Sequence, residues 1–325
     1  MKALISGISG QDGSYLAELL LSKGYEVHGI VRRSSIDAED RLWRIKGVAD
    51  RLHIHSGTIE SYQSMFRIIE SIQPDEFYHL GAQSFVADSF KDEFTTMRVN
   101  IDSTHNILSI LADRVPGCRF YFAASSEMYG DVLETPQTEA TPFNPRSVYG
   151  ITKCAGFHLT KHYRDAHGMH ASSGILFNHE SPRRGSDFVT KKISLAAAAI
   201  SLKRQDILKL GNLDAVRDWG HSKDYVEAMW LMLQKDAPDD YLIATGITAS
   251  VRDFCGMCFT RVGLNWEDCV TVDSSFFRPT DVNLLVGSAD KAHRELGWRP
   301  SVNLQQLADE MVDAALVKLS GGGVS

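Results

Sequence analysis

The sequence predicts an α/β protein in which a doubly wound parallel sheet is followed by a smaller α/β domain. Strand patterns alternate with helix patterns through about the first 175 of the 325 residues, and such alternation forms a parallel sheet with helices on both faces. Three glycines, Gly7, Gly10 and Gly13, lie between the first expected strand and the first expected helix. We therefore predict domains at 1–175 and 176–325, with the chain able to cross between them.

Most of the expected helices in the first domain end at a residue that disfavours their continuation. Gly24 ends the first helix, and Pro74 and Pro116 follow two later ones. The expected strands span 2–6, 26–31, 52–55, 76–80 and 119–124, and the expected helices span 11–23, 61–73 and 96–115.

The pattern loosens after about residue 173. Residues 174–177 read as one more strand, and 178–187 are expected to form a loop because the segment is polar and contains Pro, Arg and Gly. Short strands and helices follow. Among them, 250–262 is expected to be a helix, because Ser250 and Asp253 can form a capping box.

Composition restricts the class of protein. A net charge of -7 argues against sequence-independent binding of nucleic acid, and no apolar run approaches the roughly 18 residues of a membrane span. The N-terminus opens on a strand pattern rather than a signal peptide, so a cytoplasmic location is expected. Five scattered cysteines fit reduced thiols. No metal site is expected, because the pairs Cys255–Cys258 and His53–His55 lack further ligands.

The glycine triplet predicts a dinucleotide site. A pyrophosphate needs backbone N–H groups at a helix N-terminus and no side chains in its way. Gly7, Gly10 and Gly13 meet both needs directly after a buried strand. The first domain is therefore predicted to be Rossmann-type.

The end of the second expected strand bears on the choice of dinucleotide. NAD sites usually place a carboxylate there, whereas this chain has Arg32 and Arg33, whose guanidinium groups suit a 2′-phosphate. The pattern favours NADP over NAD; the alternative is a solvated arginine pair on a loop.

A second set of residues indicates acid–base chemistry. Tyr149 and Lys153 are four residues apart, so on a helix they share a face, and a nearby ammonium is expected to lower the pKa of the phenol. Ser125 and Glu127 follow the expected strand 119–124, at the end where parallel sheets bind ligands.

These residues lie in longer strings that resemble the extended short-chain dehydrogenases and, within them, the GDP-mannose 4,6-dehydratase family. The resemblance runs over nearly the whole chain. Its strings include GISGQDGSYLAELL from Gly7, LGAQSFV from Leu80, ILFNHESPRRG from Ile175, GNLDAVRDWGHSKDYVEAMWLML from Gly211 and FRPTDV from Phe277.

The resemblance implies a role for each matching position. The catalytic set is Ser125, Glu127, Tyr149 and Lys153. The NADP-binding set is Gly7, Gly10, Gln11, Asp12, Gly13, Arg32, Thr58, Ile59, Leu80, Gly81, Ala82, Gln83, Ser84, Lys153, His179 and Arg184. The set around the GDP-sugar substrate is Asn178, Lys192, Arg217, Arg278 and Asp281.

Three positions depart from the family pattern. Thr58 stands where the family has an Asp, so recognition of adenine must rest on other contacts. Ser125 replaces a Thr but keeps the hydroxyl, and Asp281 is one methylene shorter than the usual Glu.

The reaction that the resemblance implies starts with oxidation at C4 of GDP-mannose. Tyr149 takes the proton of the 4-hydroxyl, Glu127 removes the C5 proton and helps the 6-hydroxyl leave, and the hydride returns from NADP to C6. A GDP-heptose 4,6-dehydratase is the main alternative. A nucleotide-sugar 4-epimerase or reductase is less favoured, because it has no use for Glu127. A dTDP-glucose 4,6-dehydratase typically carries Asp-Glu where this chain has Ser126 and Glu127. A non-enzymatic NADP sensor would have no reason to keep Glu127, Tyr149 and Lys153 together. The resemblance also implies a homo-oligomer, paired partly through residues 33–44.

Overall fold

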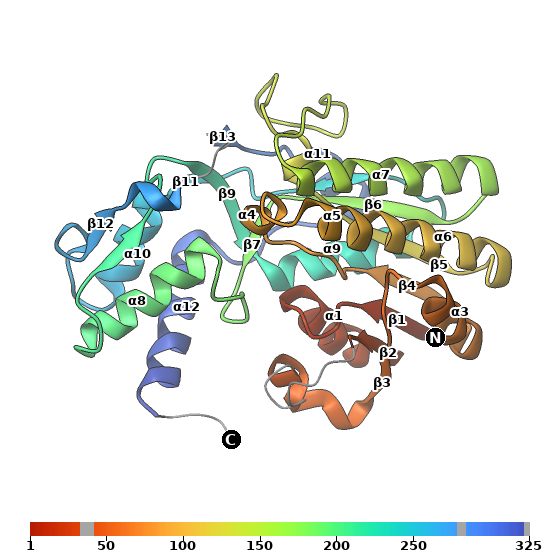
Figure 1. Ribbon diagram of the computed structural model, residues 1–325, viewed down its shortest axis with the longest axis horizontal. Coiled ribbons are helices and arrows are strands. Elements are labelled where there is room, and N and C mark those ends of the chain that lie inside the picture. Colours follow the sequence, from red (N-terminus) through yellow and green to blue (C-terminus); the bar gives the residue numbers. More distant parts are fainter. Residues whose placement is uncertain (33–41, 278–283, 322–325) are drawn as a thin grey trace.

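The computed structural model describes residues 1–32, 42–277 and 284–321, and it divides them between a large sheet and a smaller lobe (Figure 1). Seven strands of the described residues form the large sheet in the order β10-β6-β5-β4-β1-β2-β3, and every pair in it is parallel. The strands are β1 (Lys2–Ser6), β2 (Glu26–Val31), β3 (Leu52–Ser56), β4 (Glu76–His79), β5 (Arg119–Ser125), β6 (Ala171–Leu176) and β10 (Tyr241–Ile243).

Helices cover both faces of this sheet. One face packs on α3 (Tyr62–Ile72), α6 (Ser103–Arg114) and α7 (Val148–His167), through apolar residues such as Ile69 and Ile107. The other face packs on α1 (Gln11–Ser22), α9 (Ser222–Gln234), α11 (Asp290–Leu296) and the 3₁₀ helix η1 (Trp43–Arg51). The predicted doubly wound α/β class is confirmed by this arrangement.

The smaller lobe holds a second set of strands. β7 (Asn178–Glu180), β11 (Thr248–Ser250) and β13 (Leu284–Leu285) all pair with β9 (Val216–His221), while β8 (Leu208–Leu210) pairs with β12 (Val270–Val272). The helices α8 (Val189–Ser201), α10 (Val251–Arg261) and α12 (Leu304–Leu319) enclose the core of this lobe.

The chain crosses between the two lobes more than once. It leaves the large sheet after β6, enters the small lobe through β7 and β9, and returns so that α9 packs on α1 and β10 pairs with β6. None of the helices within the described residues is long and apolar enough to cross a membrane.

Three local predictions can be compared with the structure. The capping box of Ser250 and Asp253 is confirmed. The segment expected to be one helix at 96–115 is helical but not regular. α5 (Glu93–Met97) is followed directly by the π-helical turn Arg98–Asp102 and then by α6. The expectation that 178–187 is all loop was wrong, because Asn178–Glu180 gains a strand partner in β9, which lies about forty residues along the chain.

Short elements complete the described chain. They are α4 (Val86–Ser89), η3 (Ser126–Met128), η4 (Trp266–Asp268) and η5 (Ser274–Phe276).

Candidate active site

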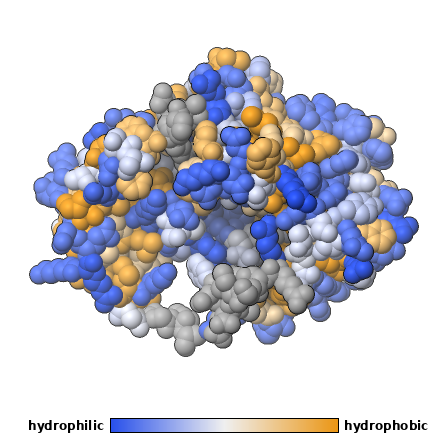
Figure 2. Space-filling model, in the orientation of Figure 1, coloured by the Kyte–Doolittle hydropathy of each residue, from blue (hydrophilic) through white to orange (hydrophobic). Residues whose placement is uncertain are grey.

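A cavity of about 1040 Å³ opens at the carboxyl ends of the sheet strands, between the two lobes. Hydrophilic side chains gather around this hollow (Figure 2). The strand order reverses between β1 and β4, because β2 and β3 lie on one side of β1 and β4, β5 and β6 on the other. Open α/β sheets bind ligands at such a point.

The glycine turn forms one end of the cavity. Gly7 has a φ of +77°, and a Cβ there would lie 2.9 Å from the amide nitrogen of Gly81. A Cβ on Gly13 would collide with the carbonyl oxygen of Gly7. Gly10 is the N-cap of α1, and no side chain there occupies the N-terminal amides of the helix. The first residues of α1 line the cavity, so these amides lie at its edge. This geometry fits a bound pyrophosphate.

A network behind the turn supports the segment after β4. The Ser6 hydroxyl accepts a hydrogen bond from the Gly81 amide at 3.1 Å and lies 2.8 Å from Nδ1 of His79. Burial lowers the pKa of His79 to about 3, so its ring is neutral at physiological pH. Leu80, Gly81, Ala82 and Ser84 line the cavity.

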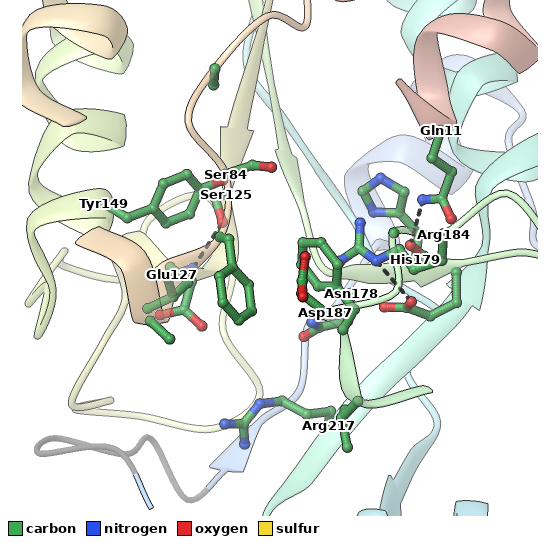
Figure 3. A pocket seen from close by; sticks show the side chains of 18 of the residues that line it. Gln11, Ser84, Ser125, Glu127, Tyr149, Asn178, His179, Arg184, Asp187 and Arg217 are labelled. Atoms are coloured by element: carbon green, nitrogen blue, oxygen red, sulfur yellow. Dashed lines mark hydrogen bonds and ion pairs between the residues drawn. The ribbon is translucent and has the colours of Figure 1, made fainter. Parts of the chain in front are cut away.

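Ser125, Glu127 and Tyr149 lie together on one wall of the cavity (Figure 3). Lys153 also lines this cavity, one helical turn after Tyr149 on α7. Ser125 ends β5, and its hydroxyl accepts a hydrogen bond from the Glu127 amide at 3.2 Å. Tyr149 stands in the first turn of α7, which Ser147 caps through the Gly150 amide at 3.0 Å. The chain therefore presents a hydroxyl, a carboxylate, a phenol and an ammonium to one space.

Burial dominates the electrostatics of this wall. It raises the pKa of Tyr149 to about 12, with the Ser125 hydroxyl opposing it and the Glu127 carboxylate adding to it. Burial also lowers the pKa of Lys153 to about 8. The expectation that Lys153 lowers the pKa of Tyr149 was wrong for this structure. The Lys153 ammonium donates to the carbonyl of Ala123 at 2.7 Å and lies 5.7 Å from the centre of the phenol ring.

The opposite wall is the segment 178–185, which is joined to α1 by hydrogen bonds and ion pairs. His179 lies 2.9 Å from the Asp12 carboxylate through Nε2 and 2.7 Å from the Phe177 carbonyl through Nδ1. Gln11 donates to the Asp12 carboxylate and to the His179 carbonyl, at 3.1 and 3.0 Å. The carboxylate raises the pKa of His179 against the opposing effect of burial, and the imidazolium holds the pKa of Asp12 at about 2 despite its burial.

Arg184 and Glu180 make a second charged pair on this wall. Nε of Arg184 lies 2.9 Å from the Glu180 carboxylate, which also accepts from Thr190 at 2.6 Å. The Arg184 guanidinium lies over the Phe188 ring, 3.5 Å from its centre. Asn178, Lys192 and Arg217 complete the predicted substrate side, and Figure 3 shows Arg217 reaching the cavity from β9.

Four predicted residues do not line the cavity. Arg32 is 60% exposed and lies 3.6 Å from Glu60. Gln83 exchanges hydrogen bonds with Asn100, the Thr58 amide donates to Ser64, and Ile59 packs behind Gly81. Arg33, Arg278 and Asp281 lie outside the described residues.

Sequence reasoning missed several residues that line the cavity. They are Arg44, Glu180, Asp187, Phe188 and Phe276. Asp187 and Glu180 lie in the polar segment 178–187, which was predicted to be a loop. Arg44 was considered only as the end of the predicted pairing segment 33–44, and no motif singles out Phe276.

The fold is that of the extended short-chain dehydrogenases. UDP-glucose 4-epimerase from Thermotoga maritima superposes with a TM-score of 0.86 at 23% identity, covering 98% of this chain and 100% of that one. DesIV, a dTDP-glucose 4,6-dehydratase from Streptomyces venezuelae solved with NAD, gives 0.84 at 23% identity over 99% and 98%.

Within that class the chain belongs to the GDP-mannose 4,6-dehydratase family, whose model matches residues 4–311. The GDP-mannose 4,6-dehydratase of Sinorhizobium fredii is 47% identical over 98% of this chain and 97% of its own length. The human GDP-mannose 4,6-dehydratase is 46% identical over 96% of this chain and 90% of its own.

Proposed function

We propose that the protein is a GDP-mannose 4,6-dehydratase, which converts GDP-mannose into GDP-4-keto-6-deoxymannose and water with NADP as its resident cofactor. The observation that carries the proposal is the convergence of Glu127 with Ser125, Tyr149 and Lys153 on one cavity wall. Oxidation alone needs the phenol and the ammonium. Elimination of water needs a further acid–base group, and Glu127 supplies it.

The residues present fit such a cofactor. We infer that the glycine turn holds the pyrophosphate, that segment 80–84 lies along the dinucleotide, and that His179 and Arg184 flank it. When bound, an oxidised nicotinamide would supply the acceptor for the hydride of C4, the same hydride for C6, and a positive charge that favours the phenolate form of Tyr149. Relatives of the same fold were solved with NAD or, for RMD from Pseudomonas aeruginosa, with NADPH.

The chain's own groups then act in sequence. Tyr149 takes the proton of the 4-hydroxyl, and the Ser125 hydroxyl assists it by favouring the ionised phenol. The new ketone acidifies the C5 hydrogen, which Glu127 removes. The proton on Glu127 passes to the 6-hydroxyl, which leaves as water. Each of these acid–base groups typically contributes about 10²–10⁴-fold in rate.

We infer that the nucleotide diphosphate is held across the small lobe. Asn178, Lys192 and Arg217 line that end of the cavity, and cationic side chains there would pair with the diphosphate. Residues 176–325 would thus bind mainly substrate and residues 1–175 mainly cofactor, with the chain crossing between them.

The experiment that tests the function is a substrate panel. Purified protein is incubated with GDP-mannose, a GDP-heptose, UDP-glucose and dTDP-glucose, and products are weighed for the loss of one water. We expect dehydration of GDP-mannose and no turnover of dTDP-glucose. Preferred turnover of the heptose, or equal competition by dTDP-glucose, would overturn the substrate assignment.

Glu127→Gln separates a dehydratase from a simple oxidoreductase. The amide nearly matches the shape of the acid but cannot move a proton. We expect retained binding of GDP-mannose and hydride transfer to the cofactor, with water release slowed by about 10²-fold or more. Single-turnover mixing follows nicotinamide absorbance and dehydrated product separately. Parental formation of product would assign a structural role to Glu127.

The assembly state is proposed on family resemblance alone. We propose a homo-oligomer; residues 33–41 of the predicted pairing segment lie outside the described residues. Light scattering at working concentration tests the claim, and a monomer would refute it.

A further inference from the structure

Arg44 is a half-buried cation at the rim of the glycine turn. It lies in η1, and its guanidinium donates from Nε to the carbonyl of Arg183 at 2.7 Å and from Nη1 to the carbonyl of Ser9 at 3.3 Å. The Trp43 ring lies beneath it at 4.5 Å. These contacts fix the plane of the guanidinium through Nε and Nη1, and neither of them uses Nη2. Arg44 also lines the cavity.

The charge of Arg44 differs from that of its neighbours in one respect. Arg183 is paired with the Glu18 carboxylate at 2.6 Å, and Arg184 with Glu180 at 2.9 Å. Arg44 bonds only to carbonyl oxygens, and no carboxylate of the described residues pairs with it. Burial and repulsion from the two neighbouring arginines lower its pKa, yet a guanidinium stays charged at any physiological pH. The site therefore holds a positive charge that an anion would compensate.

The topology indicates which part of a dinucleotide would lie there. Tyr149 and Lys153 flank β5, so the reactive ring belongs on the β4–β5 side of the turn. η1 lies in the connection from β2 to β3, on the other side of β1. In this class of fold the adenosine ribose lies near the end of the second strand. Arg44 thus approaches from the ribose side, against the Ser9 carbonyl.

We propose that Arg44 binds the 2′-phosphate on the adenosine ribose of NADP and so selects NADP over NAD. The inference rests on the proposed function for the nature of the cofactor. It assigns to Arg44 a specificity role for which Arg32 and Arg33 were the sequence candidates, and Arg33 lies outside the described residues. Arg32 is largely exposed, is close to Glu60 and does not line the cavity.

Binding measurements on cofactor-free protein test this assignment. Dissociation constants of NADP, NAD and 2′,5′-ADP are measured by calorimetry for the parent, Arg44→Gln and Arg44→Lys. Loss of a charge-assisted contact should weaken NADP and 2′,5′-ADP about tenfold to a hundredfold in Arg44→Gln, with NAD within about twofold of the parent. Arg44→Lys should fall between, because it keeps the charge but loses the planar fork.

Two matched variants serve as controls. Arg51→Gln removes an exposed cation from the same 3₁₀ helix and should leave all three constants unchanged. Arg32→Gln tests the competing guanidinium. The melting temperature of each cofactor-free variant shows whether it folds, and Arg44→Lys carries the comparison if Arg44→Gln does not.

The outcomes separate the inference from the proposed function. Unchanged NADP affinity in both Arg44 variants, an equal loss for NADP and NAD, or a selective loss only in Arg32→Gln would each overturn the role of Arg44. In those cases the dehydratase proposal would stand. A parent that binds neither dinucleotide would overturn the proposed function, and the inference with it.

Discussion

The two walls of the cavity are organised by different forces. On the wall of β5 and α7, Tyr149 and Lys153 are 8% and 5% exposed and are held by the hydrophobic core, a helix cap and one backbone carbonyl. On the wall of segment 178–185, charged pairs join the small lobe to α1. The first wall consists of core elements, so its side chains are held mainly by packing. The second depends on ion pairs, which hold only while both partners carry their charge.

The largest effect should come from the buried wall. Tyr149→Phe removes the proton acceptor without changing packing, so we expect the turnover of GDP-mannose to fall by about 10²–10⁴-fold. The free energy of unfolding in urea should stay within about 1 kcal/mol of the parent, because the phenol hydroxyl supports no core contact. An equal loss of activity and stability would show that this wall is not independent of the fold.

The next effect should come from Glu180, the most buried carboxylate of the charged wall. Its side chain is 2% exposed and holds both Arg184 and Thr190. Glu180→Gln leaves Arg184 without its counter-charge, and breaking a buried pair in this way costs about 3 kcal/mol. Urea unfolding measures the loss.

A surface pair provides the matched control for Glu180. Arg252 and Asp214 lie 2.7 Å apart but are 45% and 77% exposed. Asp214→Asn should therefore change the free energy of unfolding much less than Glu180→Gln does, because water and salt screen an exposed pair. Similar losses in Asp214→Asn and Glu180→Gln would contradict the importance of burial.

The smallest effect should be the pH dependence of the Asp12–His179 pair. The folded-state pKa of Asp12 is about 2 against a usual 3.8, which corresponds to roughly 2 kcal/mol that is present above pH 3.8 and lost as pH falls toward 2. His179 has the opposite sign. Its pKa is raised above 6.5, so its contribution is complete below pH 6.5 and is lost as pH rises through the folded-state value.

Unfolding measured from pH 5 to 9 isolates the histidine. The parent should lose stability as pH rises above 6.5, and His179→Gln should lose that part of the slope. Asp12→Asn should remove it as well, because the carboxylate is the group that raises the pKa of His179. A parental slope in both variants would assign the pH dependence to other groups.

Much of the large sheet could be predicted because its signals are local. The strand at 2–6, the turn glycines and the helix stops at Gly24 and Pro74 each depend on residues within one or two turns of each other. Tyr149, Lys153, Ser125 and Glu127 could be found for the same reason, since their spacing and their place after a strand are visible in the chain.

What the sequence alone determined is therefore the class of fold, the glycine turn and the acid–base set, because periodicity, turn chemistry and short spacings are written locally. Tertiary structure alone decided the rest. Asn178–Glu180 became a strand only through pairing with β9, and the pKa of Tyr149 rose because packing removed water from it. Asp12 contacts His179 at a separation of 167 residues, and Arg44 contacts Ser9 and Arg183 at separations of 35 and 139 residues. Such contacts depend on how elements far apart in the sequence pack together, and a local sequence pattern contains no information on that packing.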